Sequence, residues 1–373
     1  MSVPEFAHAM LREIHEQPQA LERLLAAYLA GDAFKPAIFD PLAEWFSAAS
    51  QLVIVASGSS RHAGLAAEIM FEDRTGMAVD VEYASEYSYR RSNTTPDAAV
   101  LVISQSGETA DTLAALRAAA ARGHRTMAVT NVPDSTMMRE AQHALSTEAG
   151  VELAIPATKS FLNQLALLNL LSLAAAQARG TMTRAEVARQ LTLMRAVPAQ
   201  VAAGLDPWAR RAQACAAAFD DAKTFLFLGR GVHYPIAREG ALKLKESSYV
   251  HAEGYPSGEV LHGPNALVSD AVPLVVLASY DPRLEESEAR YARTLHLLGI
   301  LRGQGARVMA TANAGDRQVA EVAEQVIEVP PAEEHLLPLL EVIPLQLFAY
   351  YLAVQKGVDV DRPRNLVKSV PVG

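Results

Sequence analysis

Short, unbroken runs of apolar residues alternate with longer helical patterns along most of the chain. Runs without polar alternation are typical of strands that are buried on both faces. In the first half we predict such strands over Gln51–Ser60, Ala98–Gly107 and Arg125–Asn131. A helical pattern follows each one, and the pattern that begins at Thr109 closes at Gly123. Strands that alternate with helices in this way predict a parallel sheet with helices on both faces.

The same order of elements recurs in the second half of the chain. Thr224–Glu246 repeats the layout of Leu52–Asp73, which is an apolar strand, a glycine turn and a helix that carries small residues and a glutamate. Val272–Asp281 and Ala306–Asn313 then correspond to the second and third strands of the first half. Such self-similarity predicts a duplicated α/β unit. Two short helices are expected before the first unit, and one helix over about Leu336–Lys356 after the second.

These patterns divide the chain into four parts. We expect an N-terminal helical arm (1–45), a first α/β domain (46–196), a second α/β domain (205–355) and a C-terminal tail (356–373). Pro198, Gly204 and Pro207 interrupt the pattern between the two domains, so a hinge is predicted there.

Composition narrows the class of protein. The 373 residues are enough for two domains with separate cores. The net charge of −9 argues against a nucleic-acid-binding surface, although a local group of backbone amides can still bind an anion. The single cysteine, Cys215, excludes a disulfide framework and a multi-cysteine zinc site, and is expected to be a small buried side chain.

Two segments bear on the location of the protein. The N-terminal residues lack the cationic start and apolar core of a signal peptide. Phe161–Ala178 is strongly apolar, but asparagine and glutamine residues interrupt it. We therefore expect a buried core helix there rather than a membrane span, and a cytoplasmic protein with no membrane partner.

Hydroxyl-rich segments follow the predicted strands of the first half. Ligands of parallel sheets bind beyond the carboxyl ends of the strands, where helix N-termini favour anions. Three segments therefore form a candidate phosphate site; their polar residues are Ser104, Gln105, Ser106 and Thr109, then Ser59 and Ser60, then Thr158 and Lys159. The alternative is that the hydroxyls merely cap helices and form turns. Neither GxxxxGK[ST] nor GxGxxG occurs in the required context, so a nucleotide is poorly supported.

Candidate catalytic groups lie in the second half. Glu239, Lys243 and Glu246 fall at i, i+4 and i+7, so one helix face carries all three. They form either a solvated salt-bridged stripe or, at the ligand edge of the sheet, a carboxylate for proton transfer beside a cation for an oxyanion. His262, in the loop "HGP", is either an acid–base group or a structural histidine.

The C-terminal tail carries one further candidate. A tail of this kind is usually frayed, yet Leu366, Val367 and Val370 flank Lys368. A lysine in a partly apolar pocket could contact, or form a Schiff base with, an open-chain sugar carbonyl.

Several of these motifs together resemble a known family. "REIHEQP", "SQSGET", "FLGRG", "EGALKLKE", "HAEGYPSGEVLHGP" and "DRPRNLVKSV" are similar to segments of the isomerase half of glucosamine-6-phosphate synthase. That half consists of two sugar isomerase (SIS) domains, and the resemblance runs from about Met10 to the C-terminus. It implies two tandem SIS domains, each with a mostly parallel, doubly wound (flavodoxin-like) sheet between helices.

The resemblance also implies roles for individual residues. Glu246 moves a proton between C1 and C2 of the sugar, with Lys243 beside it and Glu239 in support. His262 opens the sugar ring from the neighbouring subunit of a homodimer, and Lys368 meets the open-chain sugar. Contacts to the phosphate are implied for Ser60, Ser104, Gln105, Ser106 and Thr109. The other residues that we expect to bind the sugar or its phosphate are Ser59, Ile155, Ala157 and Lys159.

Two departures from the family pattern suggest which reaction is catalysed. Ser2 follows Met1 and no cysteine precedes Cys215, so we expect no glutaminase domain and no glutamine-dependent synthesis. Ala157 stands where the synthase usually has serine. In both features the chain resembles the stand-alone SIS-type glucosamine-6-phosphate deaminases. These enzymes convert glucosamine 6-phosphate and water to fructose 6-phosphate and ammonia. No cofactor or metal is expected, since no ligand cluster occurs.

Three other readings remain open. A fructosamine-6-phosphate deglycase would release an amino acid instead of ammonia. A galactosamine-6-phosphate deaminase would differ only in the orientation of one hydroxyl. A non-catalytic sugar-phosphate sensor is disfavoured, because the residues before the first strand are too few for a DNA-binding domain and the net charge is negative.

Overall fold

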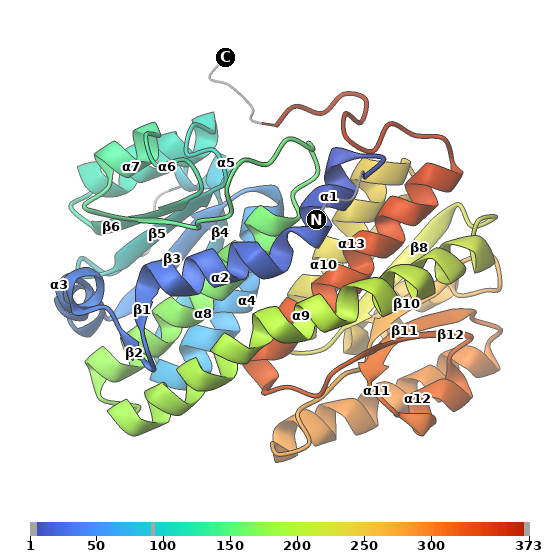
Figure 1. The fold of residues 1–373 in the computed structure, drawn as a ribbon. Coiled ribbons are helices and arrows are strands. Elements are labelled where there is room, and N and C mark those ends of the chain that lie inside the picture. Colours follow the sequence, from blue (N-terminus) through green and yellow to red (C-terminus); the bar gives the residue numbers. More distant parts are fainter. Residues whose placement is uncertain (1–5, 91–93, 369–373) are drawn as a thin grey trace, which may run out of the picture. The chain divides into compact units, whose positions relative to one another are not determined.

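The computed structural model describes residues 6–90 and 94–368 (Figure 1). The chain folds as two compact units, which we describe separately. The first unit comprises Gln19–Glu152, Lys159–Ala196 and Val367–Gly373, and the second comprises Met1–Pro18, Leu153–Thr158 and Val197–Leu366.

The first unit is built on a five-stranded parallel sheet with the order β4-β3-β5-β6-β7. Its strands are β3 (Gln51–Ala56), β4 (Ala78–Tyr83), β5 (Ala99–Ser104), β6 (Arg125–Thr130) and β7 (His143–Ser146). The three predicted strands are confirmed as β3, β5 and β6, in the centre of the sheet. The edge strands β4 and β7 were not predicted, because they are partly exposed and lack an unbroken apolar run.

Helices cover both faces of this sheet, as predicted. They are α2 (Gln17–Tyr28), α3 (Pro36–Ser47), α4 (Gly58–Thr75), α5 (Ala84–Tyr87), α6 (Ala110–Ala121), α7 (Thr136–Glu140) and α8 (Lys159–Arg179), with a small hairpin of β1 (Leu29–Ala30) and β2 (Ala33–Phe34). Side chains of α5, α6 and α7 pack against Val53, Val55 and Val100 on one face. Helix α4 contacts Ile54 on the opposite face and packs along α8.

The second unit repeats this sheet. Its parallel strands have the order β9-β8-β10-β11-β12, which is the same succession as in the first unit. They are β8 (Thr224–Gly229), β9 (His251–Pro256), β10 (Leu274–Leu277), β11 (Val308–Asn313) and β12 (Gln325–Val329). The duplicated α/β unit is therefore confirmed.

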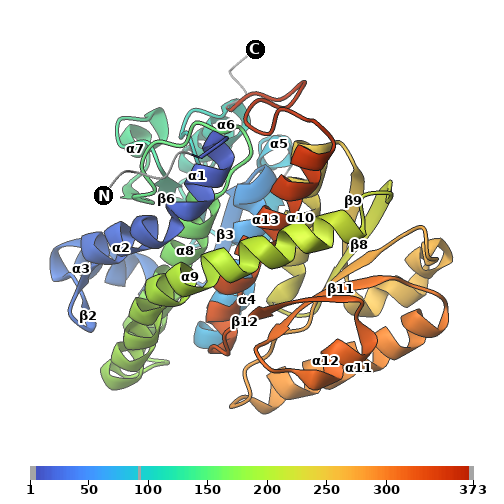
Figure 2. The ribbon, with the colours of Figure 1, turned by 45° about the vertical axis from the view of Figure 1, so that its right-hand side comes forward.

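The helices of the second unit include α10, which carries the candidate catalytic face. They are α1 (Ala9–His15), α10 (His233–Ser248), α11 (Glu285–Gly303), α12 (Arg317–Val322) and α13 (Leu337–Gln355), with 3-10 segments η1 (Ser257–His262), η2 (Pro264–Leu267) and η3 (Glu334–Leu336). Helices α10 and α13 lie side by side in both views (Figures 1 and 2). A Cβ on Gly240 would lie 2.7 Å from Leu345 and 2.9 Å from Phe227, so glycine permits this close packing.

The predicted interruption of the helical pattern is wrong, although the two units do divide within the predicted segment. Pro198 and Pro207 lie inside α9 (Arg184–Ala218), a continuous helix of 35 residues. Proline removes one backbone donor from a helix, but tertiary packing can hold the helix together. Here Val197, Val201 and Trp208 are all buried beside the prolines. The boundary between the two units falls within this helix, between Ala196 and Val197.

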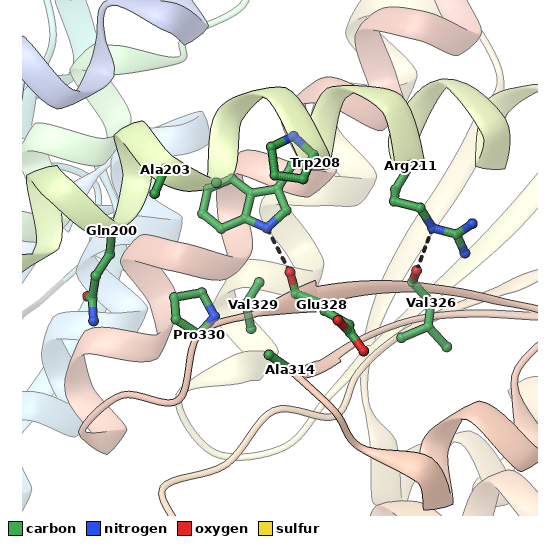
Figure 3. Close-up of a pocket in the computed structure, with 11 residues that line it drawn as sticks. Gln200, Ala203, Trp208, Arg211, Ala314, Val326, Glu328, Val329 and Pro330 are labelled. Atoms are coloured by element: carbon green, nitrogen blue, oxygen red, sulfur yellow. Dashed lines mark hydrogen bonds between the residues drawn. The ribbon is translucent and has the colours of Figure 1, made fainter.

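Side chains of α9 cover the free edge of β12 (Figure 3). Trp208 Nε1 donates to the Glu328 carbonyl at 2.7 Å, and Arg211 Nε donates to the Val326 carbonyl at 3.1 Å. These bonds occupy carbonyl groups that an edge strand would otherwise offer to another chain. A groove of about 590 Å³ lies beside Trp208, and none of the residues that line it is a predicted site residue.

Two helical segments, Lys159–Arg179 and Glu334–Gln355, are long and apolar enough to cross a membrane by length and composition. In each, 89% of the apolar window is buried inside the protein. The prediction of a buried core helix over 161–178 is therefore confirmed by α8. Cys215 is also buried as expected, and burial raises the pKa of its thiol to about 12.

Candidate functional site

The segment 104–109 joins the end of β5 to the start of α6 in the first unit. Its hydroxyls hold the turn together. Ser104 Oγ lies 3.1 Å from Thr109 Oγ1 and accepts from the Gly107 amide at 3.2 Å, and Ser106 Oγ accepts from the Glu108 amide at 3.1 Å. In the described structure no side chain caps α6 at Thr109. The first-turn amides and the positive end of the helix dipole are therefore available to an anion.

Gly107 makes this turn possible. Its φ is +65°, a left-handed conformation that favours glycine. A Cβ at this position would also lie 2.5 Å from Ser135 Cβ and 2.8 Å from Thr130 Oγ1. The Gln105 carbonyl fixes the other side of the turn, since it accepts from the Asn131 amide at 3.0 Å.

Ser59 and Ser60 lie in the first turn of α4, directly after β3. Because β3 pairs with β5, this turn and segment 104–109 are at the same edge of the sheet, as expected. Ser60 is buried, and its hydroxyl accepts from Gln164 Nε2 at 3.0 Å. Ser59 is partly exposed, unlike Ser60.

The tail lysine forms an ion pair that the sequence did not predict. Lys368 Nζ lies 2.6 Å from Glu152 Oε2. Glu152 is buried and also accepts from the Ser160 amide at 3.1 Å and the Ser160 hydroxyl at 2.6 Å. Lys159, the first residue of α8, is buried next to Ser160 in the sequence. The one feature of the sequence that could have pointed to this pair is the glutamate within the apolar stretch "GVELAIPA".

The apolar pocket expected around Lys368 is not found in the described residues. Leu366 and Val367 are 37% and 61% exposed, and Val370 lies outside the described residues. Charge pairing with Glu152, rather than apolar packing, therefore holds this lysine.

In the second unit, Glu239, Lys243 and Glu246 meet on α10. Lys243 Nζ lies 3.5 Å from Glu239 Oε1 and donates to Glu246 Oε2. The side chains of Glu239 and Lys243 are 0% and 1% exposed, whereas Glu246 is 22% exposed. The solvated salt-bridged stripe is therefore wrong. The cluster is a buried ion pair with one carboxylate that reaches the surface.

The other predicted residues of the second unit lie on two segments. His262 is exposed at the end of η1. Ile155 and Ala157 are partly exposed in the segment Leu153–Thr158. Backbone hydrogen bonds anchor this segment, since the Ile155 amide donates to the Asp361 carbonyl at 2.9 Å. The carboxylate of Glu13 accepts from the Leu153 amide at 2.6 Å.

Sequence reasoning also missed a buried polar cluster. His233, at the start of α10, lies with its Nδ1 2.7 Å from Glu341 Oε2 on α13, and Ser279 donates to the other oxygen of Glu341. Burial lowers the pKa of His233, but the charge and hydrogen bond of Glu341 outweigh this and raise it. The two residues are 108 positions apart, so no local pattern signals the pair.

Known proteins identify the family to which these two units belong. The SIS domain profile matches residues 46–174 and 218–356. The chain belongs to the SIS domain family. The first match contains segment 104–109 and the second contains α10 and His262. The expected family, the two SIS domains and the α/β fold are thereby confirmed.

Two relatives of this chain have the same name. Proteins named isomerizing glutamine–fructose-6-phosphate aminotransferase from Gloeobacter violaceus and Chlorobaculum tepidum are 41% identical over 371 residues and 42% identical over 370. Both alignments cover 98% of this chain, which spans 59% of the length of each relative.

Solved structures agree with this family. One is the C-terminal domain of glucosamine-fructose-6-phosphate aminotransferase from Francisella tularensis, with a TM-score of 0.89 and 35% identity. The match covers 97% of the present chain and 100% of the Francisella chain. Another is a glucosamine-6-phosphate deaminase from Thermotoga maritima, with a TM-score of 0.74 and 22% identity. The match covers 98% of the present chain and 100% of the Thermotoga chain. The second likeness concerns the fold alone.

Proposed function

We propose that this SIS chain isomerises and deaminates an amino sugar phosphate, converting glucosamine 6-phosphate and water to fructose 6-phosphate and ammonia. The buried cluster on α10 is the observation that carries the proposal. Glu246 is its most exposed member and is the group that removes the C2 proton and returns it at C1. Lys243 stabilises the enolic oxygen, and Glu239 balances its charge in the protein interior.

The phosphate group of the substrate is assigned to segment 104–109. The hydroxyls of Ser104, Ser106 and Thr109 and the amides at the start of α6 are donors of the kind that bind phosphate.

The remaining steps open the ring and release ammonia. His262, on η1, is the acid–base group for ring opening, supplied by the neighbouring subunit of a homodimer. Transfer of the C2 proton to C1 leaves an imine at C2. Water adds to this imine and ammonia departs, so that the ketone of fructose 6-phosphate remains. The ion pair with Glu152 supports a role for Lys368 as a cation near the open-chain sugar.

A second candidate is the reverse reaction, in which ammonia and fructose 6-phosphate form glucosamine 6-phosphate. The relatives that are 41% and 42% identical favour it, since their name specifies an isomerizing aminotransferase. The same residues would act in reverse order, with imine formation first and proton transfer from C1 to C2 second.

The deciding experiment follows ammonia and fructose 6-phosphate when the purified protein is given glucosamine 6-phosphate. Equimolar release of both, lost in Glu246→Gln and kept in Glu288→Gln on the exposed part of α11, is expected. Galactosamine 6-phosphate is tested in parallel to identify the epimer. Release of an amino acid from a fructosamine 6-phosphate, with no ammonia from either amino sugar, would instead establish a deglycase. Consumption of ammonia with fructose 6-phosphate, without the forward reaction, would establish the synthetic direction.

A further inference from the structure

A cavity of about 430 Å³ lies between α11 and η1 in the second unit. Its polar lining consists of Arg230, Ser257, Arg293 and His296. No residue assigned to the proposed reaction lines it, and no carboxylate is among the lining residues. Two arginines without a carboxylate give the lining a positive charge, which favours an anionic ligand.

Ser257 is a buried hydroxyl at the wall of this cavity. The residue is 0% exposed, and its Oγ has no hydrogen-bond partner among the described residues. A buried polar group without a partner is unfavourable, and each such group in a folded protein calls for an explanation such as a ligand. Ser257 follows β9 directly, at the carboxyl end of the sheet where ligands of parallel sheets bind.

Two arginines line the same cavity, the half-buried Arg230 and the exposed Arg293. Arg230 follows β8, and its guanidinium lies against Gly258, where an added Cβ would be 3.3 Å from Nη1. Its Nε is buried without a hydrogen bond, and in the described part of the chain neither Arg230 nor Arg293 forms an ion pair with a carboxylate. Burial, and then the charge of Arg293, lower the pKa of Arg230. A bound anion would relieve this repulsion between like charges.

We propose that this cavity is a binding site for a phosphate group, separate from segment 104–109. Guanidinium groups match the geometry of phosphate oxygens, and the Ser257 hydroxyl adds a buried donor. The cavity has the size of a small-molecule site. Leu261, Leu297 and Ile300 form an apolar wall beside the cations, which suits the organic part of a phosphate monoester.

The site adjoins a segment with an assigned role. Ser257 and Leu261 belong to η1, which ends at His262. A phosphate held here would therefore fix the segment that carries the group assigned to ring opening. This consequence rests on the proposed function, whereas the binding site itself does not.

The test is a calorimetric titration of the full chain with inorganic phosphate and, separately, with glycerol 3-phosphate at constant ionic strength. Two binding sites are expected in the wild type. The double variant Ser106→Ala and Thr109→Val should lose one of them. Arg293→Ala should weaken the other by about tenfold or more, because it removes a charged donor. Arg317→Ala, which replaces an exposed arginine on α12, is the matched control and should change neither.

The outcomes separate this proposal from the proposed function, because binding is measured without turnover. Arg293 is exposed on a helix, so its replacement by alanine is expected to preserve the fold, and thermal unfolding checks this. Tighter binding of glycerol 3-phosphate identifies an ester ligand, and equal affinities identify inorganic phosphate. A single site that Arg293→Ala leaves unchanged would overturn the proposal. A change of oligomeric state in Arg293→Ala, without a change in phosphate binding, would overturn it as well.

Discussion

Lys368 forms an ion pair with Glu152, a residue 216 positions earlier in the chain. Its Nζ lies 2.6 Å from Glu152 Oε2, and the two hydrogen bonds from Ser160 hold the same carboxylate. The glutamate is buried while the lysine side chain is 27% exposed. A cation in this arrangement is positioned by its charge, which suggests an electrostatic role rather than that of a nucleophile.

We therefore predict that Lys368→Arg retains much more activity than Lys368→Ala. Arginine keeps the positive charge beside Glu152, whereas alanine leaves a buried carboxylate without its cation. Lys368→Ala should lower the rate of fructose 6-phosphate release by about 10²-fold or more, as expected for loss of a charged group at a reacting centre. Both variants are compared with the wild type by steady-state kinetics.

A Schiff-base role for Lys368 predicts a different result for the arginine variant. Arginine cannot form the imine, so both variants would then be equally inactive. Borohydride treatment in the presence of fructose 6-phosphate distinguishes the two roles by mass spectrometry. A stable sugar adduct on Lys368 would contradict the electrostatic role.

The second prediction concerns stability of the cluster on α10. Lys243→Met should lower the free energy of unfolding by about 3–5 kcal/mol, because it leaves the buried Glu239 and the partly buried Glu246 without their cation. Adding Glu239→Gln should restore part of this loss. Unfolding in urea measures each variant, and Lys245→Met, at an exposed position of the same helix, is the control.

The double variant Lys243→Met and Glu239→Gln distinguishes a loss of charge pairing from a loss of packing. If Lys243→Met and the combined variant were equally unstable, the loss would come from packing rather than from an uncompensated charge. A loss of less than about 1 kcal/mol in Lys243→Met would show that the cluster is not held by the ion pair at all.

The α10 cluster and the Lys368 pair show what the sequence could and could not predict. The spacing of Glu239, Lys243 and Glu246 placed them on one helix face, since that follows from helix geometry alone. Their burial could not be read from spacing, because it depends on packing by other elements. Glu152 and Lys368 are joined only by the tertiary fold, so no pattern near either residue signalled the pair.

The same distinction applies to the sheets. The central strands β3, β5 and β6 each contain an apolar run and are buried along nearly their whole length, and so they were predictable. The strand β9 reads "HAEGYP", with a glycine and a proline, and it pairs as a strand only because β8 lies beside it. The two prolines of α9 predicted a break in the helix, whereas buried neighbours keep the helix continuous.

The third prediction tests segment 104–109 through Gly107. Gly107→Ala must adopt a positive φ, at about 1–2 kcal/mol, and must also place its Cβ against Ser135. Gly123→Ala is the matched control, because Gly123 also has a positive φ, of +82°, but has no atom within 4 Å of an added Cβ. We expect Gly107→Ala to be the less stable of the two by about 1–3 kcal/mol, the usual range for overpacking.

Phosphate binding gives an independent measure of the same substitution. Gly107→Ala should weaken the phosphate site that Ser106→Ala and Thr109→Val remove, and Gly123→Ala should not. If both glycine variants bound phosphate like the wild type while remaining folded, segment 104–109 would not be the phosphate site.

The last prediction is a pH dependence that arises in α4. Burial, followed by the charges of Glu72 and Asp80, raises the pKa of Glu68 to about 7. The folded state therefore binds the Glu68 proton more tightly than the unfolded state does. Stability should fall as the pH rises from the unfolded pKa of about 4.3 towards 7, and this loss should persist at higher pH.

Glu68→Gln removes the titration and isolates its effect. The variant should be more stable than the wild type at about pH 8, and the difference should shrink towards about pH 4, where the wild-type carboxyl is protonated in both states. Thermal unfolding across this range measures the difference, and Glu44→Gln, at an exposed position of α3, controls for the general loss of one negative charge. A difference between Glu68→Gln and the wild type that stayed constant with pH would mean that Glu68 ionises normally. In that case Arg61, whose charge lowers the pKa of Glu68, would compensate fully for its burial and its acidic neighbours.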